Sequence, residues 1–165
     1  MICTYFMSVK IRAKGFTFIE LMVTLAILAL LASIAVPLVQ VTMQRNKEQN
    51  LTQSLRQIRE AIDAYKKAAD EGRVKKNADE SGYPASLSLL VEGVEDIKDP
   101  KRRKIYFLRK LPQDPMQDKT DDGDSNWGKR SYQSTAEDPK EGDDVFDVYS
   151  TSNEAGLNGV PYRDW

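Results

Sequence analysis

The chain has 165 residues, which is enough for one ordinary domain with one modest core. Its 24 basic and 25 acidic residues leave a formal net charge of -1, so the overall charge does not predict nucleic acid as the main partner. Histidine is absent and Cys3 is the only cysteine, which excludes histidine-dependent catalysis, a disulfide within the chain and a zinc site of cysteines and histidines.

The first apolar segment follows a short basic stretch. Lys10, Arg12 and Lys14 carry three positive charges ahead of Phe16, with no acid among the residues before Phe16. Leu21–Val39 then holds 19 residues without a charge, which is enough for a helix that crosses about 30 Å of hydrocarbon. The basic residues favour a cytoplasmic N-terminus, with the remainder of the chain sent across the membrane. The alternative is a buried helix in a small globular domain.

The apolar pattern continues as a helical stripe beyond the uncharged segment. Apolar residues recur there at spacings of three and four, and no turn signal comes before Gly72. We therefore predict one helix over residues 16–71, with a membrane half at 16–40 and an amphipathic half at 41–72. Pro37 lies inside this helix and predicts a kink or a local unwinding. The stripe consists of Leu51, Leu55, Ile58, Ile62, Tyr65 and Ala69.

The remaining residues, 73–165, predict a small head with an antiparallel sheet. Ala85–Val91 is typical of a short helix, and the best strand candidates are Ser131–Thr135 and Val145–Ser150. The turn-rich segment between these strands predicts a hairpin that packs on the amphipathic half of the long helix. Lys104–Leu108 is a candidate third strand. The expected fold class is α+β.

A motif at the start of the apolar segment predicts proteolytic processing. It reads Lys14-Gly15-Phe16-Thr17-Phe18-Ile19-Glu20 and leads directly into the uncharged run. The small, flexible Gly15 gives a membrane protease access to the backbone, and a cut after it creates a new amine on Phe16. Glu20 falls within the membrane segment, where an ionisable group costs a few kcal/mol and needs a cationic partner. The new Phe16 amine is the natural candidate, either in the same chain, four residues away, or on a neighbouring subunit.

Two alternatives to this interpretation stay open. In the first, Glu20 lies close enough to the membrane interface to be solvated by lipid headgroups, and Gly15 merely precedes a helix. In the second, signal peptidase uses the small-x-small pattern Ala32-Ser33-Ile34-Ala35 and releases a chain that begins at Val36. Against the second, the apolar run continues past that cut and the buried Glu20 would have no explanation.

The motif resembles the prepilin cleavage and N-methylation signal of type IV pilins and type II secretion pseudopilins. This resemblance implies a leader at residues 1–15, a cut between Gly15 and Phe16, and methylation of Phe16 to N-methylphenylalanine. It also implies that Glu20 pairs with the amine of a neighbouring subunit and so sets the subunit register. Pro37 is a second candidate residue for assembly.

A second resemblance covers the head. The order of its aromatic, proline and glycine residues resembles that of the major, G-type, pseudopilin of type II secretion. Together with the N-terminal signal, the resemblance covers most of residues 14–165. The chain departs from the pattern by an insertion at Met116–Asn126. The matching residues are Tyr83-Pro84, Leu111-Pro112, Asp114-Pro115, Trp127-Gly128, Tyr132, Phe146-Asp147-Val148-Tyr149-Ser150 and Asp164-Trp165.

The resemblance also implies a structural calcium ion, because major pseudopilins commonly bind one in the loop after the last strand. In this chain that loop is Thr151–Tyr162, and it is poor in acids for a strong calcium site. The alternative is a loop held by hydrogen bonds, and no other cofactor is required. The candidate ligands are Ser152, Asn153, Glu154 and Asn158, with Asp164 as a further acid.

Two charged clusters carry weaker signals. An acidic cluster surrounds Gly123 but fails the EF-hand pattern, because Thr120 falls at the third position and Lys129 at the last. We expect a solvated surface loop there. Lys101–Lys104 is a run of four positive charges, and we expect a solvated edge rather than a site for phosphate or lipid headgroups. The acidic cluster consists of Asp118, Asp121, Asp122 and Asp124.

Together the resemblances imply a structural subunit and no enzyme. The subunit would span the bacterial inner membrane once, with its head in the periplasm, and would polymerise with itself into a pseudopilus for protein secretion across the outer membrane. The implied partners are minor pseudopilins, the prepilin peptidase and the inner-membrane assembly platform. The alternatives are a type IV pilus subunit for adhesion, motility or DNA uptake, and a signal-anchored protein of other function, such as a tethered enzyme or sensor.

Overall fold

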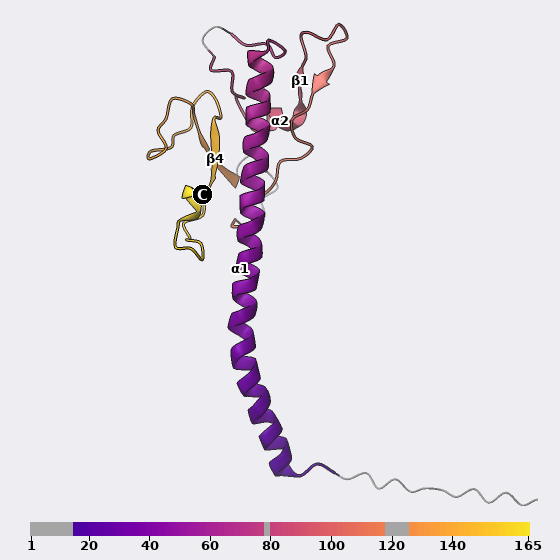
Figure 1. The fold of residues 1–165 in the computed structure, drawn as a ribbon, viewed down its shortest axis with the longest axis vertical. Helices are drawn as coiled ribbons and strands as arrows, with labels where there is room; N and C mark the ends of the chain where they lie inside the picture. The colour runs from indigo at the N-terminus through magenta and orange to yellow at the C-terminus, as the bar shows by residue number, and fades with distance from the viewer. Residues whose placement is uncertain (1–14, 78–79, 118–125) are drawn as a thin grey trace, which may run out of the picture. The chain divides into compact units, whose positions relative to one another are not determined.

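The computed structural model describes residues 15–77, 80–117 and 126–165 (Figure 1). The chain divides into two compact units, Met1–Thr42 and Met43–Trp165, which are described separately below. One long helix and two small antiparallel sheets confirm the predicted α+β class. In chain order the elements are α1 (Phe18–Asp70), α2 (Ser88–Glu92), β1 (Val94–Glu95), β2 (Lys104–Ile105), β3 (Trp127–Arg130), β4 (Asp147–Ser150) and the 3-10 turn η2 (Tyr162–Asp164).

The predicted long helix is confirmed, and its first turn is capped by a side chain. Thr17 precedes α1, and its hydroxyl oxygen accepts the N–H of Glu20 at 3.3 Å while its carbonyl accepts the N–H of Leu21 at 3.1 Å. A threonine followed three residues later by a glutamate is the sequence signature of a capped helix start. The helix therefore begins at Phe18, two residues after the predicted cleavage point.

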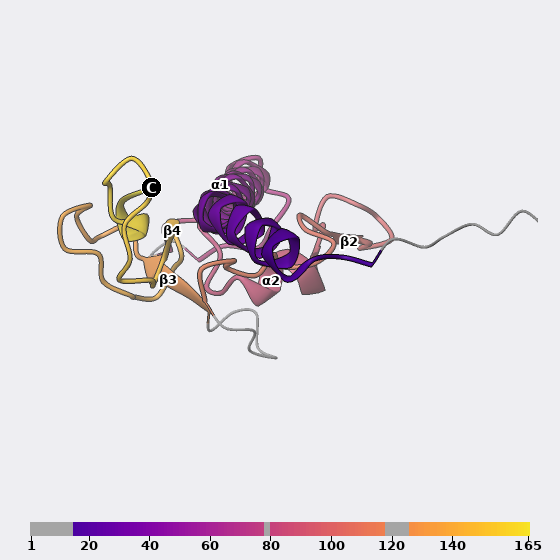
Figure 2. The ribbon, with the colours of Figure 1, turned by 90° about the horizontal axis from the view of Figure 1, so that it is seen from below.

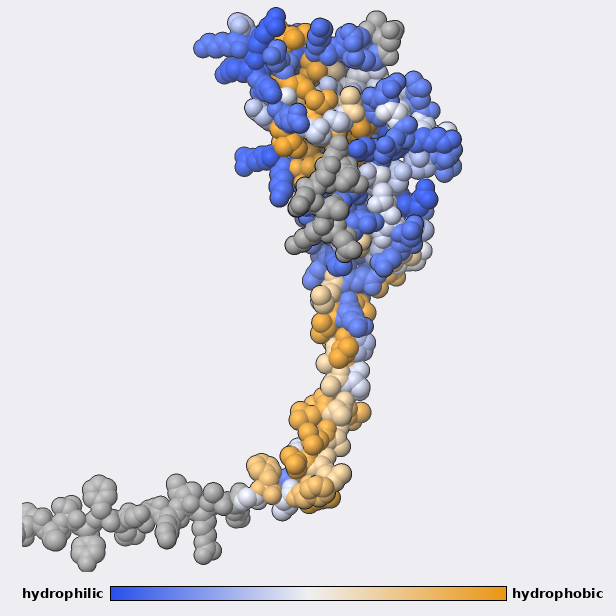
Figure 3. Space-filling model, turned by 180° about the vertical axis from the view of Figure 1, so that it is seen from behind, coloured by the Kyte–Doolittle hydropathy of each residue, from blue (hydrophilic) through white to orange (hydrophobic). Residues whose placement is uncertain are grey.

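The part of α1 in the first unit has no apolar cover from the described chain. Every residue from Gly15 to Thr42 is exposed, and the helix is long and apolar enough to cross a membrane (Figure 3). Burying one such leucine, isoleucine or valine side chain contributes about 1.5–3 kcal/mol. These residues thus need an apolar environment outside the single chain. The helix α1 also continues through Pro37, so the local unwinding that was one of the two expectations there does not occur.

Short polar side chains within this apolar stretch bond back to the helix itself. The hydroxyl of Thr24 donates to the carbonyl of Leu21 at 2.9 Å, and that of Ser33 donates to the carbonyl of Leu30 at 2.7 Å. Such bonds satisfy the hydroxyl groups without water. The serine and threonine residues are therefore compatible with a hydrocarbon surrounding.

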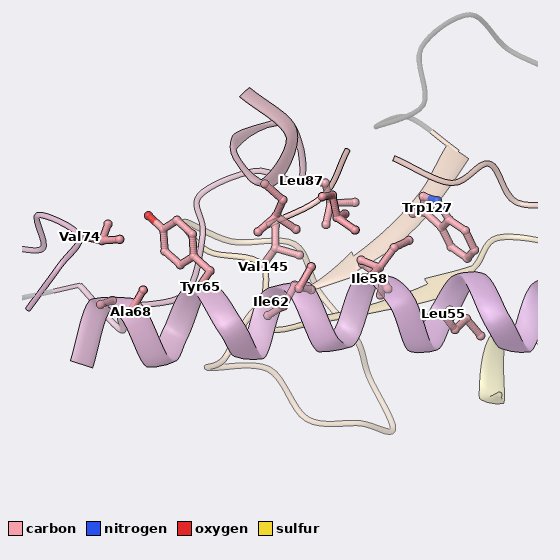
Figure 4. Packing of buried hydrophobic residues seen from close by; sticks show 14 of the residues in the cluster. Leu55, Ile58, Ile62, Tyr65, Ala68, Val74, Leu87, Trp127 and Val145 are labelled. Atoms are coloured by element: carbon pink, nitrogen blue, oxygen red, sulfur yellow. The ribbon is translucent and has the colours of Figure 1, made fainter. Parts of the chain in front are cut away.

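In the second unit, the predicted apolar stripe of α1 forms one wall of the core (Figure 4). All six stripe residues are buried, together with Ala61 and Ala68 on the same face. Leu87, Trp127 and Val145 come from the rest of the head and cover this face. The amphipathic half of the helix is thus the surface on which the head is built, as the spacing predicted.

The second unit places its two sheets on different sides of α1, with α2 packed between them (Figure 2). The helix itself stops at a left-handed glycine: Gly72 has φ of 70°, and the next N–H, of Arg73, bonds to the carbonyl of Ala68 at 2.9 Å. This arrangement satisfies carbonyls that the helix end leaves unpaired. The chain then turns away from the helix axis into the head.

The predicted hairpin is only partly right. β4 falls inside the predicted Val145–Ser150, but its partner is β3, which ends one residue before the predicted strand at Ser131. Residues 131–135 form a turn instead, because the N–H of Ser131 bonds to the carbonyl of Lys140 and the N–H of Tyr132 to the carboxylate of Asp144. These donors are not available for a strand ladder.

The predicted third strand does not extend this hairpin. Only Lys104 and Ile105 of the predicted segment are extended, and they pair antiparallel with β1, a strand that the sequence analysis missed. The short helix also begins later than predicted, at Ser88. Phe107 and Leu108 instead donate their N–H groups to the carbonyl of Leu90 in α2. These bonds connect the β1–β2 sheet to that helix.

The core on α1 predicts a large cost for one truncation. Ile58 is fully buried, so Ile58→Ala should lower the free energy of unfolding of the head by about 2–5 kcal/mol through lost burial and a cavity. The exposed neighbour Gln57 provides the control, because Gln57→Ala should change it by less than about 0.5 kcal/mol. Urea unfolding of the detergent-solubilised chain, followed by tryptophan fluorescence, measures both. Equal midpoints for the two variants would contradict the assigned core.

Candidate functional site

The predicted cleavage point lies outside the helix. Gly15, Phe16 and Thr17 have no regular secondary structure, and Phe16 is 79% exposed. A protease needs backbone that is accessible and not locked in helical hydrogen bonds, so this segment has the geometry of a substrate. Lys14 and the rest of the predicted leader, residues 1–14, lie outside the described residues.

Glu20 lies in the first turn of α1, on an exposed part of the helix. The N-terminus of a helix favours a negative charge, because its first N–H groups carry partial positive charge. Within the residues that the structure describes, no Lys or Arg forms an ion pair with Glu20. The helix start therefore offers Glu20 favourable backbone dipoles, and the described part of the chain offers it no cationic side chain.

Several residues of the G-type pattern meet around the buried Trp127. The indole N–H of Trp127 donates to the carbonyl of Pro112 at 2.8 Å. Its neighbour Gly128 faces Tyr149 across the β3–β4 ladder, and a Cβ on that glycine would lie 2.3 Å from the tyrosine ring. The indole hydrogen bond thus joins the Leu111-Pro112 and Trp127-Gly128 motifs, and glycine at position 128 leaves room for Tyr149.

A buried carboxylate joins the proline-containing segment to the end of β4. Asp114 is 2% exposed, and its Oδ2 accepts the hydroxyl of Ser150 at 2.6 Å while its Oδ1 accepts the N–H of Met116 at 2.8 Å. The Ser150 hydroxyl oxygen in turn accepts the N–H of Ser152 at 3.2 Å. Asp114 therefore fixes the point at which the C-terminal loop leaves the sheet.

Three aromatic residues of the pattern form a separate cluster in the head. The ring of Tyr83 lies 5.6 Å from that of Tyr132 and 5.0 Å from that of Phe146, measured between centroids. Cations flank the cluster, with Lys66 over Tyr83 and Arg130 over Phe146. The aromatic residues thus hold the 131–135 turn against the head, which is a structural role.

The C-terminal loop is attached to α1 by two polar side chains of the helix. Glu48 accepts the N–H of Leu157 at 2.8 Å and the hydroxyl of Tyr162 at 3.0 Å. About three helical turns further along α1, Arg59 donates to Asp147 at 2.8 Å and to the main-chain oxygen of Trp165 at 2.9 Å. The sequence analysis missed both residues as functional candidates, although both lie on or beside the helical face that carries the apolar stripe.

Comparison with known proteins supports the N-terminal motif and the pattern of the head. A family described as "Prokaryotic N-terminal methylation motif" matches residues 10–36. The type II secretion system core protein G of Pseudomonas aeruginosa is 30% identical over 159 residues, which cover 93% of this chain and 96% of that protein. This chain belongs to the type II secretion core protein G family. It is thus a G-type pseudopilin of the type IV pilin-like class.

Other members of this family show the same level of similarity. The core protein G of Vibrio cholerae is 28% identical over 158 residues, which cover 93% of this chain and 92% of that protein. The Aeromonas hydrophila protein is 30% identical over 110 residues, which cover 64% of this chain and 69% of its own. No solved structure matches the chain significantly.

The four candidate calcium ligands of this pseudopilin do not fit a calcium ion as they are arranged. Ser152 is 7% exposed and its hydroxyl oxygen accepts the N–H of Glu154 at 3.3 Å, while the side-chain oxygen of Asn158 accepts the N–H of Val160 at 3.0 Å. Asn153 is exposed, and Glu154 is the single carboxylate among the four. Within the described residues, no group of three or more Asp, Glu, His or Cys residues could hold a metal. A hard cation prefers several carboxylate and carbonyl oxygens at once.

The two charged clusters have different outcomes. The acidic cluster at 118–124 lies outside the described residues. The basic run Lys101–Lys104 covers the end of the loop between β1 and β2 and the first residue of β2, and Arg102 has an unusual positive φ of 47°. Asp99 accepts the side chain of Arg103 at 2.6 Å and the N–H of Lys101 at 3.0 Å. The ion pair between Asp99 and Arg103 therefore shapes the loop from within.

The same loop predicts a dependence of stability on pH. Arg73 donates two hydrogen bonds to Asp96 and holds the pKa of that carboxyl below its usual value, and Arg103 lowers the pKa of Asp99 in the same way. Because these pKa values are lower in the folded chain than in the unfolded chain, their stabilisation is present above about pH 4 and is lost as the pH falls further.

Arg73→Gln should therefore weaken the fall of the melting temperature between about pH 4 and pH 2, because one of the two depressed carboxyl pKa values returns toward normal. Melting curves of the detergent-solubilised chain at each pH measure the effect. Lys75→Gln, at an exposed position two residues on, is the control and should follow the wild-type curve. If the melting temperatures of wild type and Arg73→Gln fell in parallel with pH, the ion pair of Arg73 with Asp96 would not be responsible for the pH dependence.

Proposed function

We propose that this chain is the precursor of a subunit that polymerises into a type II secretion pseudopilus. One observation carries the proposal: an exposed, non-helical cleavage segment directly precedes an uncovered apolar helix, on a chain that aligns with core protein G over nearly its whole length. The subunit would help to move folded proteins across the outer membrane. Its role is structural and not enzymatic, in line with the secretion-system proteins that it resembles.

The cut after Gly15 links processing to assembly. Before cleavage the nitrogen of Phe16 is a neutral amide, and after cleavage it is a cationic amine at the end of the same apolar helix. Glu20, which has no cationic partner in the described chain, then gains one on a neighbouring subunit. An ion pair inside hydrocarbon is stable only when both charges are present, so only processed subunits would assemble in register.

The environment of the subunit follows from its two units. The apolar helix and the motif fit anchoring in the inner membrane. We infer that the N-terminus lies in the cytoplasm and the head in the periplasm, because the positive charges precede the apolar segment. The partners are then further copies of this chain, minor pseudopilins, the prepilin peptidase and the inner-membrane assembly platform. Pro37 lies in the uncovered half of α1, so we infer that it contributes to the contacts between subunits.

The processing site predicts a defined mature N-terminus. Edman sequencing or mass spectrometry of the membrane-extracted chain should give Phe16 with a methylated amine. Gly15→Val should leave the uncleaved precursor in the membrane, because a branched side chain blocks close approach to the backbone. Ala35→Val is the control for ordinary secretion and should still yield Phe16. A mature chain that begins at Val36 would overturn the proposal.

Glu20 predicts a separate effect on assembly. Glu20→Ala should leave cleavage after Gly15 intact but reduce filament formation at least tenfold, because the buried Phe16 amine would lose its carboxylate partner. Filaments from cells that overproduce the chain can be counted by electron microscopy. Thr24→Ala, one helical turn further on and equally exposed, should assemble normally. Wild-type filament numbers with Glu20→Ala would contradict the pairing.

A further inference from the structure

The C-terminal loop is organised by a single carboxylate oxygen of α1. Oε1 of Glu48 accepts three hydrogen bonds: from the N–H of Leu157 at 2.8 Å, the hydroxyl of Tyr162 at 3.0 Å and the side-chain amide of Gln44 at 3.3 Å. The same amide of Gln44 also contacts the hydroxyl oxygen of Tyr162 at 3.2 Å. The donors Leu157 and Tyr162 belong to the C-terminal loop and its end. Gln44 and the acceptor Glu48 belong to α1.

The two loop donors lie at places that determine the loop's path. Leu157 is at the tip of a turn in which Gly156 donates to the carbonyl of Val160 at 2.9 Å and Gly159 donates to that of Gly156 at 2.8 Å. Tyr162 starts the closing turn η2 and is 1% exposed. An anchor at both points holds the tip and the base of the loop against one turn of α1.

Several of the oxygen atoms that a cation would bind already accept hydrogen bonds within the loop. The carbonyl of Glu154 accepts the N–H of Tyr162 at 3.1 Å, and that of Val160 accepts both the N–H of Gly156 and the indole N–H of Trp165. The side-chain oxygens of Ser152 and Asn158 accept backbone N–H groups as well. A calcium ion would compete with several of these bonds, and Thr151–Tyr162 would supply it with one carboxylate, that of Glu154, with Asp164 exposed just beyond the loop.

We propose that Glu48 replaces a metal ion as the organising charge of this loop, so that the loop folds without calcium. In a calcium-binding loop, the cation is coordinated by oxygen atoms. In this loop, the carboxylate of Glu48 accepts hydrogen bonds from N–H and O–H donors. Hydrogen bonds to a charged group contribute more than those between neutral groups, especially when one partner is as buried as Tyr162. Glu48 is thus a positioning residue for the C-terminal loop.

The first experiment asks whether calcium binds. The full processed chain in detergent micelles is freed of metal with EDTA, and its melting temperature is measured as calcium chloride is raised to 1 mM, with magnesium chloride as the control. The proposal expects a shift below 1 °C that is the same for both ions. A site with a dissociation constant of about 10 μM would raise the melting temperature by several degrees at this concentration, and that result would overturn the proposal.

The second experiment asks whether Glu48 holds the loop, with hydrogen exchange of single amides measured by NMR on the same sample without metal. Glu48→Ala should speed exchange of the Leu157 amide at least tenfold, because its acceptor is gone. Exchange of the Ile58 amide, in the core part of α1, should stay unchanged, which separates a loosened loop from an unfolded chain. Glu60→Ala is the matched control, since Glu60 is an exposed glutamate on the same helix.

Glu48→Gln refines the result, because it keeps an acceptor oxygen and removes the charge. It should give exchange at Leu157 between the wild-type and Glu48→Ala rates. Equal exchange at Leu157 in the Glu48→Ala and Glu60→Ala chains would overturn the role of Glu48. Neither experiment involves filament assembly, so their outcome is separate from that of the proposed function.

Discussion

One helix in this protein has to cover its apolar surface in two different ways. In the second unit, the stripe from Leu51 to Ala69 is buried by the head of the same chain. In the first unit, every side chain from Gly15 to Thr42 is exposed, so its cover must come from lipid or from other subunits. A protein with this property is stable only in a membrane or an assembly. The proposed function follows from that constraint.

Three charged residues of α1 lie on these two kinds of surface. Glu20 lies at the start of the uncovered helix, where the cut after Gly15 supplies a compensating amine in the proposed mechanism. Glu48 and Arg59 lie along the covered half and hold the C-terminal loop and the end of the chain by hydrogen bonds. Glu48 and Arg59 are half-buried and have specific partners in the head, and the proposed mechanism gives Glu20 a specific partner in a neighbouring subunit.

Much of the head could be anticipated only as a pattern. Pro112, Asp114, Gly128 and Tyr149 were recognised by their order along the chain, and the structure shows why they belong together: Pro112 accepts the Trp127 indole, Asp114 binds Ser150 and Gly128 makes room for Tyr149. The strand at 127–130 was missed because Trp127 and Gly128 were read as a motif and not as a ladder. The donors of Ser131 and Tyr132 go to Lys140 and Asp144, which no local pattern indicates.

The sequence by itself determined the long helix, its apolar stripe and the processing motif, because helical periodicity and the absence of charge are local properties of the chain. It also contained an overlooked sign of the loop anchor: Gln44 and Glu48 continue the stripe at the spacing of Leu51 and Leu55, which places polar residues on the covered face. Only the tertiary structure decided what these residues bind. Their partners, Leu157 and Tyr162, lie more than a hundred residues away in the chain, and contacts at that separation depend on how the whole head packs.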